Sequence, residues 1–222
     1  MMTSEERIRV RLRLTAPRAM AAAGILFALL FAASVILMRL ALPETLSSDT
    51  SWVEQGARWI TLSLLLMPFA GITFLWFMGV IRDRLSEVEE HFLSTVFMGS
   101  GLLFLAMVFV AMAIAGGIVT SVGIQGSQNI QPDLVVFGRA VMLQISNVYA
   151  LRMAGAFMIS LGTIWLRTKL MPRWLVIVTY AVALILLVVI NLSLWIALIF
   201  PAWVFFVSVF FLLTNLRGPV QA

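Results

Sequence analysis

Long apolar runs constrain this chain more than any other feature of its sequence. About 20 consecutive apolar residues form a helix long enough to cross the roughly 30 Å hydrocarbon core of a membrane. The stretch from Trp174 to Asn215 is about 42 residues long and almost uninterrupted. Because that is too long for one span, we expect two spans there, joined by a turn near Leu194 to Ile199.

Six apolar segments predict an all-α, polytopic membrane protein, with six transmembrane helices in one bundle. The composition agrees, since 62% of the 222 residues are hydrophobic and only 11% are charged, whereas soluble domains are nearer half apolar and one quarter charged. We expect a basic N-terminal segment at residues 1–19 and the transmembrane domain at residues 20–217. The predicted spans are about 20–42, 59–81, 92–119, 145–166, 174–193 and 198–216.

Basic residues are distributed unevenly between the two ends of these spans. Cytoplasmic loops carry an excess of Lys and Arg. Eleven of the fifteen basic residues fall on the side that holds both termini, and only Arg39, Arg58 and Arg139 fall on the other. We therefore expect cytoplasmic N and C termini. The net charge of +5 is explained by this topology, so we expect no nucleic-acid partner. Interfacial tryptophans are predicted at the outer boundary (Trp52, Trp59) and at the inner boundary (Trp165, Trp174).

The residue types argue against most catalytic chemistry. The chain has no cysteine and one histidine, His91, which lies between predicted spans. Disulfides and thiolate sites are excluded, and haem ligation or serine hydrolysis would need a histidine inside the bundle. No Asp or Glu falls within a predicted span. We therefore expect no enzyme and no cofactor or metal.

Arg152, in the stretch "NVYALRMAG", is the charged residue that stands out inside a predicted span. It lies 15 residues before Arg167, which is about 22 Å along a helix. That places it in the outer third of the membrane, below a polar track of Tyr149, Asn147 and Gln144. An ionisable residue at this depth is a functional hypothesis by default.

Three roles for Arg152 remain open. It could bind an anion or a lipid phosphate in an outward-facing cleft. It could join helix ends through backbone carbonyls or the carboxylates of Glu54 or Asp133, or its long side chain could snorkel to the headgroups. The segment from Pro132 to about Gln144 is expected to be an outer-surface segment or a helix extension.

Two charged cytoplasmic features are further candidates. The loop "RDRLSEVEEHF" is predicted to form a solvated helical cap, although a partner contact or a metal or proton site would use the same residues: Arg82, Arg84, Glu87 and His91. The N-terminal "RIRVRLRL" alternates strictly, so an extended chain would gather its arginines on one face. That strip could contact anionic lipid or serve only to fix topology; its arginines are Arg7, Arg9, Arg11 and Arg13.

Small residues recur in the third and fourth predicted spans, for example in "GSG" at residues 99–101 and "AGG" at residues 115–117. Small side chains allow helices to approach closely in lipid. Internal packing is the expected role, although a pore lining or a ligand cleft would have the same composition.

The runs "FLWFMGVIRDRLSEVEEHFLSTVFMGSGLLF" and "NVYALRMAGAFMISLGTIWLRTKLMPRWL" resemble a family of uncharacterised, actinobacterial-type multi-pass integral membrane proteins. The resemblance covers roughly Phe74 to Leu175. It rests on the charged turn, "TVFMGSGLLF", the "YALRM" arginine and "MPRWL". It implies a bacterial inner-membrane protein and carries over no catalytic residue.

Together these features predict a non-catalytic structural, accessory or lipid-interacting subunit. Its expected partners are membrane lipids, with other membrane subunits or further copies of the chain as additional possibilities. The alternative is a small channel or transporter in which Arg152 contacts an anion or a headgroup.

Overall fold

In a computed structural model, the chain is helical apart from short turns, with no strand among the residues described. The description covers residues 4–43, 51–85, 91–126, 130–169, 171–188 and 194–216, without the side chains of residues 4–18, 84, 85, 91, 194, 215 and 216. Within these ranges, five helices are long and apolar enough to cross a membrane. The fold therefore has the character of a multi-pass membrane protein, as predicted.

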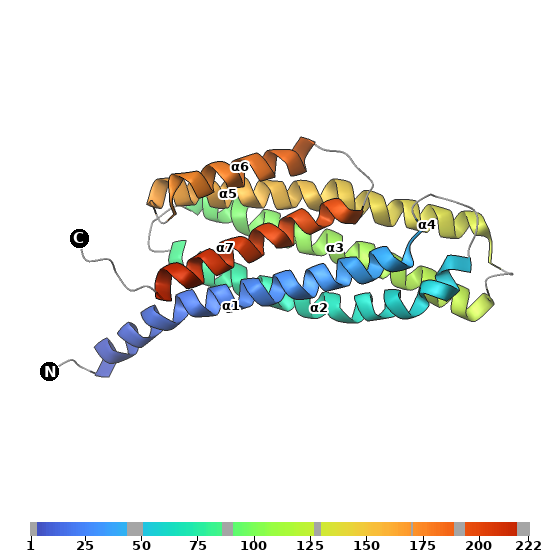
Figure 1. Ribbon diagram of the computed structural model, residues 1–222, viewed down its shortest axis with the longest axis horizontal. Helices are drawn as coiled ribbons and strands as arrows, with labels where there is room; N and C mark the ends of the chain where they lie inside the picture. Colours follow the sequence, from blue (N-terminus) through green and yellow to red (C-terminus); the bar gives the residue numbers. More distant parts are fainter. Residues whose placement is uncertain are drawn as a thin grey trace.

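The helices lie side by side as one elongated bundle (Figure 1). A π-helix joins α4 to α5, so residues 132–168 form one continuous rod. The elements are α1 (Ser4–Ala41), α2 (Ser51–Leu85), α3 (His91–Gln125), α4 (Pro132–Gln144), the π-helix (Ile145–Ala150), α5 (Leu151–Thr168), α6 (Arg173–Val188), a 3-10 helix (Leu194–Leu198) and α7 (Ile199–Leu216).

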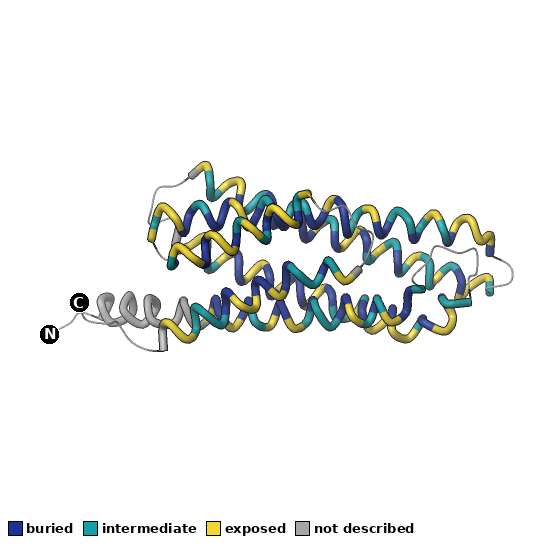
Figure 2. The backbone as a smooth tube through the Cα atoms, turned by 45° about the horizontal axis from the view of Figure 1, so that its top comes forward, coloured by how far each residue is buried: buried dark blue, intermediate teal, exposed yellow. Residues whose placement is uncertain are grey.

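The bundle has two halves of different thickness. Figure 1 shows that α6 and α7 accompany the other helices for only part of their length. We call the part that contains α6 and α7 the six-helix half; its other members are the adjoining parts of α1, α2, α3 and α5. The remainder, the four-helix half, consists of α4, the end of α1, the start of α2 and the end of α3. Figure 2 shows buried residues on the faces that the helices turn toward one another.

Five phenylalanines, one from each of five helices, fill the centre of the six-helix half. Each is at most 1% exposed. The ring centroids of Phe74 and Phe200 are 5.8 Å apart, and those of Phe104 and Phe200 are 4.7 Å apart. Such tilted and edge-to-face ring contacts add to the packing energy. The five residues are Phe27 (α1), Phe74 (α2), Phe104 (α3), Phe157 (α5) and Phe200 (α7).

The core of the four-helix half contains no such cluster among its described residues. Its buried side chains are mostly small or flexible. They form two clusters, one around Met38, Ile60 and Met142 and the other around Val53 and Val122. The smaller residues let four helices close around a narrower core than the six-helix half requires.

Small and hydroxylated residues set the closest helix contacts. Ser34 of α1 and Ser63 of α2 are buried, and their Oγ atoms lie 2.8 Å apart. Each hydroxyl also donates to the carbonyl of the other serine. Gly24 allows α1 to approach α7, because a Cβ there would lie 2.0 Å from the Ser208 Oγ. Interhelical hydrogen bonds and small residues are the usual means of helix association in lipid.

Four helices extend beyond the predicted spans. α1 begins at Ser4 rather than near Met20, and α2 begins at Ser51 rather than near Trp59. α3 continues to Gln125, and Pro132–Gln144 is a helix extension, one of the two alternatives expected for it. The polarity of residues 51–58 indicated a connection, but polar residues also form helix. A polar sequence indicates that a segment is in contact with water, but it does not determine whether the backbone is helical.

The C-terminal segment also differs in detail. α6 ends at Val188, although we expected a span through residue 193; residues 189–193 lie outside the description. A 3-10 helix occupies Leu194–Leu198 where we expected a turn. Trp165, predicted at the membrane boundary, is buried and lies 6.0 Å from Trp203 between ring centroids.

Candidate functional site

Arg152 lies near the junction of the two halves. It follows the π-helix by one residue of α5 and is half-buried. A Cβ at Gly155 would lie 3.0 Å from Leu187 and 3.1 Å from the Ala183 carbonyl oxygen. Because α5 and α6 run in opposite directions, Arg152 is level with the end of α6 at Val188.

No partner of Arg152 is found among the residues that the structure describes. Within those ranges no hydrogen bond or ion pair involves its guanidinium. Pairing with Glu54 or Asp133 therefore gains no support, and the choice between a phosphate, an anion and lipid snorkelling stays a prediction.

The predicted polar track does not form one stripe. Tyr149 is 52% exposed and Gln144 is exposed as well, whereas Asn147 is only 2% exposed. The buried Asn147 Nδ2 finds no hydrogen-bond acceptor among the described residues. The helix thus turns Asn147 toward the bundle and Tyr149 away from it.

This split follows from ordinary helix geometry, because residues two apart in a helix do not face the same side. Both residues lie in the six-residue π-helix, Ile145–Ala150. Ser146 Oγ lies 3.3 Å from the Leu143 carbonyl oxygen and 3.4 Å from Asn147 Oδ1. Short π segments inside α-helices occur frequently at functional sites.

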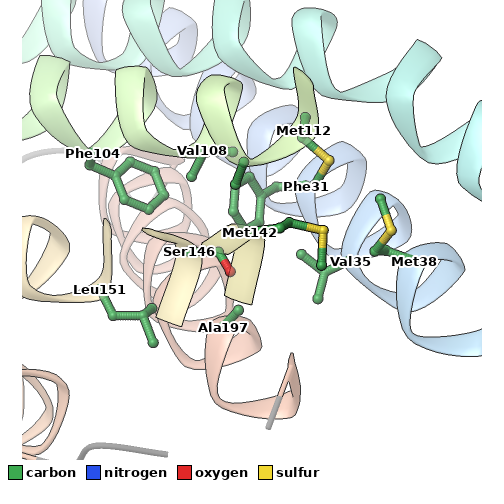
Figure 3. Close-up of a pocket in the computed structure, with 11 residues that line it drawn as sticks. Phe31, Val35, Met38, Phe104, Val108, Met112, Met142, Ser146, Leu151 and Ala197 are labelled. Carbon is green, nitrogen blue, oxygen red and sulfur yellow. The ribbon is translucent and has the colours of Figure 1, made fainter. Parts of the chain in front are cut away.

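A small cavity of about 40 Å³ lies beside the π-helix. Figure 3 shows the Ser146 hydroxyl among the side chains that surround it. Those side chains come from α1, α3, α4, α5 and the 3-10 helix, and apart from Ser146 they are apolar; they include Phe31, Val108, Met142 and Ala197. Apolar cavities of this kind stay dry, so one hydroxyl at its wall does not make it a water site.

Two arginines of the four-helix half stack on tryptophans, Trp195 of the 3-10 helix and Trp52 of α2. The Arg39 guanidinium carbon lies 5.6 Å from the Trp195 ring centroid and its Nη1 donates to the Leu42 carbonyl, 3.2 Å away. The Arg139 guanidinium lies 5.5 Å from the Trp52 ring. Arg139 Nη2 also donates to the carbonyl of Pro43. The hydrogen bond from Arg139 connects α4 to the carbonyl of Pro43, just after α1. The two cation–π contacts connect Arg39 of α1 to Trp195 and Arg139 of α4 to Trp52.

Sequence reasoning placed Arg39 and Arg139 on one side of the bundle but did not pair them with rings. It also missed Ser146 and Met142, which the fold brings to the cavity. The adjacent polar pair Ser146–Asn147 inside an apolar run was a usable signal, whereas nothing marked Met142.

The charged turn and the N-terminal strip are only partly described. Arg82 is exposed near the end of α2, and His91 begins α3. Arg84 lies in α2 without a described side chain, and Glu87 lies outside the description, so the predicted contact site is not tested. Among the described residues there is no group of three or more His, Cys, Asp or Glu that could hold a metal.

The N-terminal residues lie in a helix, since α1 begins at Ser4. The extended, two-faced strip considered for "RIRVRLRL" is therefore not the conformation found. The side chains of Arg7, Arg9, Arg11 and Arg13 are outside the description, and their contact with anionic lipid stays a prediction.

Comparisons with protein-family models, with curated proteins and with solved structures found no match to this chain. The resemblance to the actinobacterial-type membrane family therefore stays a prediction.

Proposed function

We propose that this chain is a bacterial inner-membrane protein with six spans and both termini in the cytoplasm. The five long apolar helices support this, together with the shorter apolar helix α6. α1 begins and α7 ends at the same end of the bundle (Figure 1). Twenty residues of helix cover about 30 Å, so counting outward from Arg167 puts Asn147 at the outer boundary. The segment that precedes Asn147, including α4, then lies outside the membrane.

Its proposed role is that of a non-catalytic, lipid-interacting accessory subunit. The observation that carries this proposal is the cluster of Phe27, Phe74, Phe104, Phe157 and Phe200. These rings come from five helices, meet at the centre and are each at most 1% exposed. Interiors packed in this way leave few voids larger than a water molecule, so the axis of the bundle offers no route for a solute.

Reconstitution tests this role directly. The purified protein in vesicles of phosphatidylethanolamine and phosphatidylglycerol should produce no chloride or phosphate flux above that of protein-free vesicles. Native mass spectrometry of the gently extracted protein should show retained lipids or a co-purifying membrane subunit. Flux that depends on the protein would overturn the proposal.

A channel or transporter is the second candidate, and Arg152 is the observation that favours it. The residue is half-buried, level with the end of α6, and without a hydrogen bond in the described ranges. If this candidate is right, Arg152→Gln should abolish an anion flux that the unsubstituted protein supports. Equal flux from the two proteins would count against any role for Arg152 in transport.

A further inference from the structure

A groove opens between α2 and α3 on the outside of the bundle. Its volume is about 390 Å³, which is within the range of small-molecule sites, roughly 300–1,000 Å³. Both helices belong to the candidate membrane spans, so in the topology proposed above the groove faces lipid. Its walls are apolar side chains and glycine: Leu64, Met67, Pro68, Phe109, Met112, Ala113 and Gly116.

Two glycines give the groove its shape. A Cβ at Gly71 would lie 2.4 Å from Phe109 Cζ, so glycine lets that ring lie against α2 and close one end. A Cβ at Gly116 would lie 3.3 Å from Leu64 Cδ1, so the absence of a side chain at Gly116 keeps the other end open. The groove is thus a product of particular residues and not of loose packing.

A proline also shapes the wall of the groove. Pro68 lies inside α2 and lines the groove beside Leu64. Having no N–H, it does not donate to the carbonyl of Leu64 four residues earlier, and such a proline is tolerated in membrane helices.

Its depth follows from the helix rise. Pro68 is 14 residues before Arg82, or about 21 Å, and Leu64 is one turn further out. In the topology proposed above, the groove occupies the outer third of the hydrocarbon core. Acyl carbons of outer-leaflet lipids fill that depth.

We propose that this groove holds one acyl chain of an outer-leaflet phospholipid. Its volume of about 390 Å³ accommodates a segment of one acyl chain. This inference rests on the lipid-interacting role proposed above and locates the lipid contact in the groove between α2 and α3.

The surroundings favour a flexible chain over a helix of a second copy. Helices in lipid associate where small residues let backbones approach, but large side chains protrude beside this groove. Leu65 is 61% exposed, Phe69 55% and Val110 48%. Only seven residues line it, whereas a specific protein interface uses about 20–30 residues a side.

Photocrosslinking in vesicles tests the inference. The protein is reconstituted with a phosphatidylglycerol that carries a diazirine midway along one acyl chain, and the labelled residues are mapped by mass spectrometry. We expect label to concentrate on Leu64, Phe109 and Met112. Gly116→Leu should reduce that label at least fivefold by filling the groove.

Gly117→Leu is the matched control, because a Cβ at Gly117 meets nothing within 4 Å and should leave the labelling unchanged. If Gly116→Leu does not fold, Ala113→Phe fills the same groove from an exposed position. Label spread evenly over exposed residues, or crosslinks between copies at α2 and α3, would overturn the groove as a lipid site. Neither result tests the proposed accessory role. That role would be overturned by a flux that depends on the protein.

Discussion

The six-helix half and the four-helix half are built from overlapping helices but are stabilised differently. In the first, five buried phenylalanine rings meet at the centre. In the second, methionine, valine and alanine form the core, and two arginines stack on tryptophans. Rings without polar atoms suit a surrounding of lipid. Guanidinium groups that bond to backbone carbonyls suit the part that we place at the outer boundary of the membrane.

The difference teaches that one continuous helix can serve two environments. α2 passes from the polar start at Ser51 to the apolar stretch around Phe74 without a break. If the contrast is real, substitutions in the six-helix half should weaken the whole bundle, whereas those in the four-helix half should act locally. The following experiments test that contrast.

Phe74→Ala should destabilise the bundle most, because Phe74 contacts the rings of Phe27, Phe104 and Phe200. We expect a loss of about 3 kcal/mol of unfolding free energy, at the low end for Phe→Ala, since lipid is as apolar as the core. Unfolding with sodium dodecyl sulfate in mixed micelles measures it. Phe69→Ala, on the exposed face of α2, is the control, and an equal loss there would refute the central role of the aromatic cluster.

Gly24→Ala should overpack the contact between α1 and α7. A Cβ there would lie 2.0 Å from Ser208 Oγ and 2.9 Å from Phe77 Cδ2, so we expect a loss of about 2 kcal/mol in the same unfolding assay. Adding Ser208→Ala should recover part of it by removing the clashing oxygen. Gly79→Ala, where a Cβ meets nothing within 4 Å, should have no such cost.

Arg139→Gln should loosen the four-helix half alone. The substitution removes the contact with Trp52 and the hydrogen bond to Pro43, and a hydrogen bond from a charged group contributes about 1.5 kcal/mol or more. Hydrogen exchange should quicken in α4 and at the end of α1 but not in α7. Arg58→Gln, at an exposed position of the same half, is the control; faster exchange throughout the protein would show that the halves are not separable.

The serine pair between α1 and α2 should have the smallest effect. A double-mutant cycle of Ser34→Ala and Ser63→Ala should give a coupling of about 0.6 kcal/mol, the average for polar contacts between membrane helices. Thr61→Ala supplies the comparison, because the Thr61 hydroxyl donates to the Ala57 carbonyl of its own helix and should not couple to Ser34. Zero coupling between the serines would mean that other interactions replace their hydrogen bonds without any loss of unfolding free energy.

Much of the helix order could be predicted from the sequence, and less of the candidate site. Apolar runs identified every long helix, and the helix rise put Arg139 and Arg152 at different depths. Sequence reasoning treated Gln144, Asn147 and Tyr149 as one track, but in the structure Asn147 is buried and Tyr149 is exposed. Residues two apart lie on opposite sides of a helix, so the spacing of Asn147 and Tyr149 already argued against a common face.

The sequence by itself determined that the chain is helical, that it is apolar enough for a membrane and where its basic residues gather. The tertiary structure alone decided which residues meet: the five phenylalanines at the centre, Ser146 at the cavity, and the groove at Pro68. The physical reason is that lipid and protein core are both apolar. A helix in this surrounding is hydrophobic on every side, so its sequence does not reveal which face turns toward its neighbours.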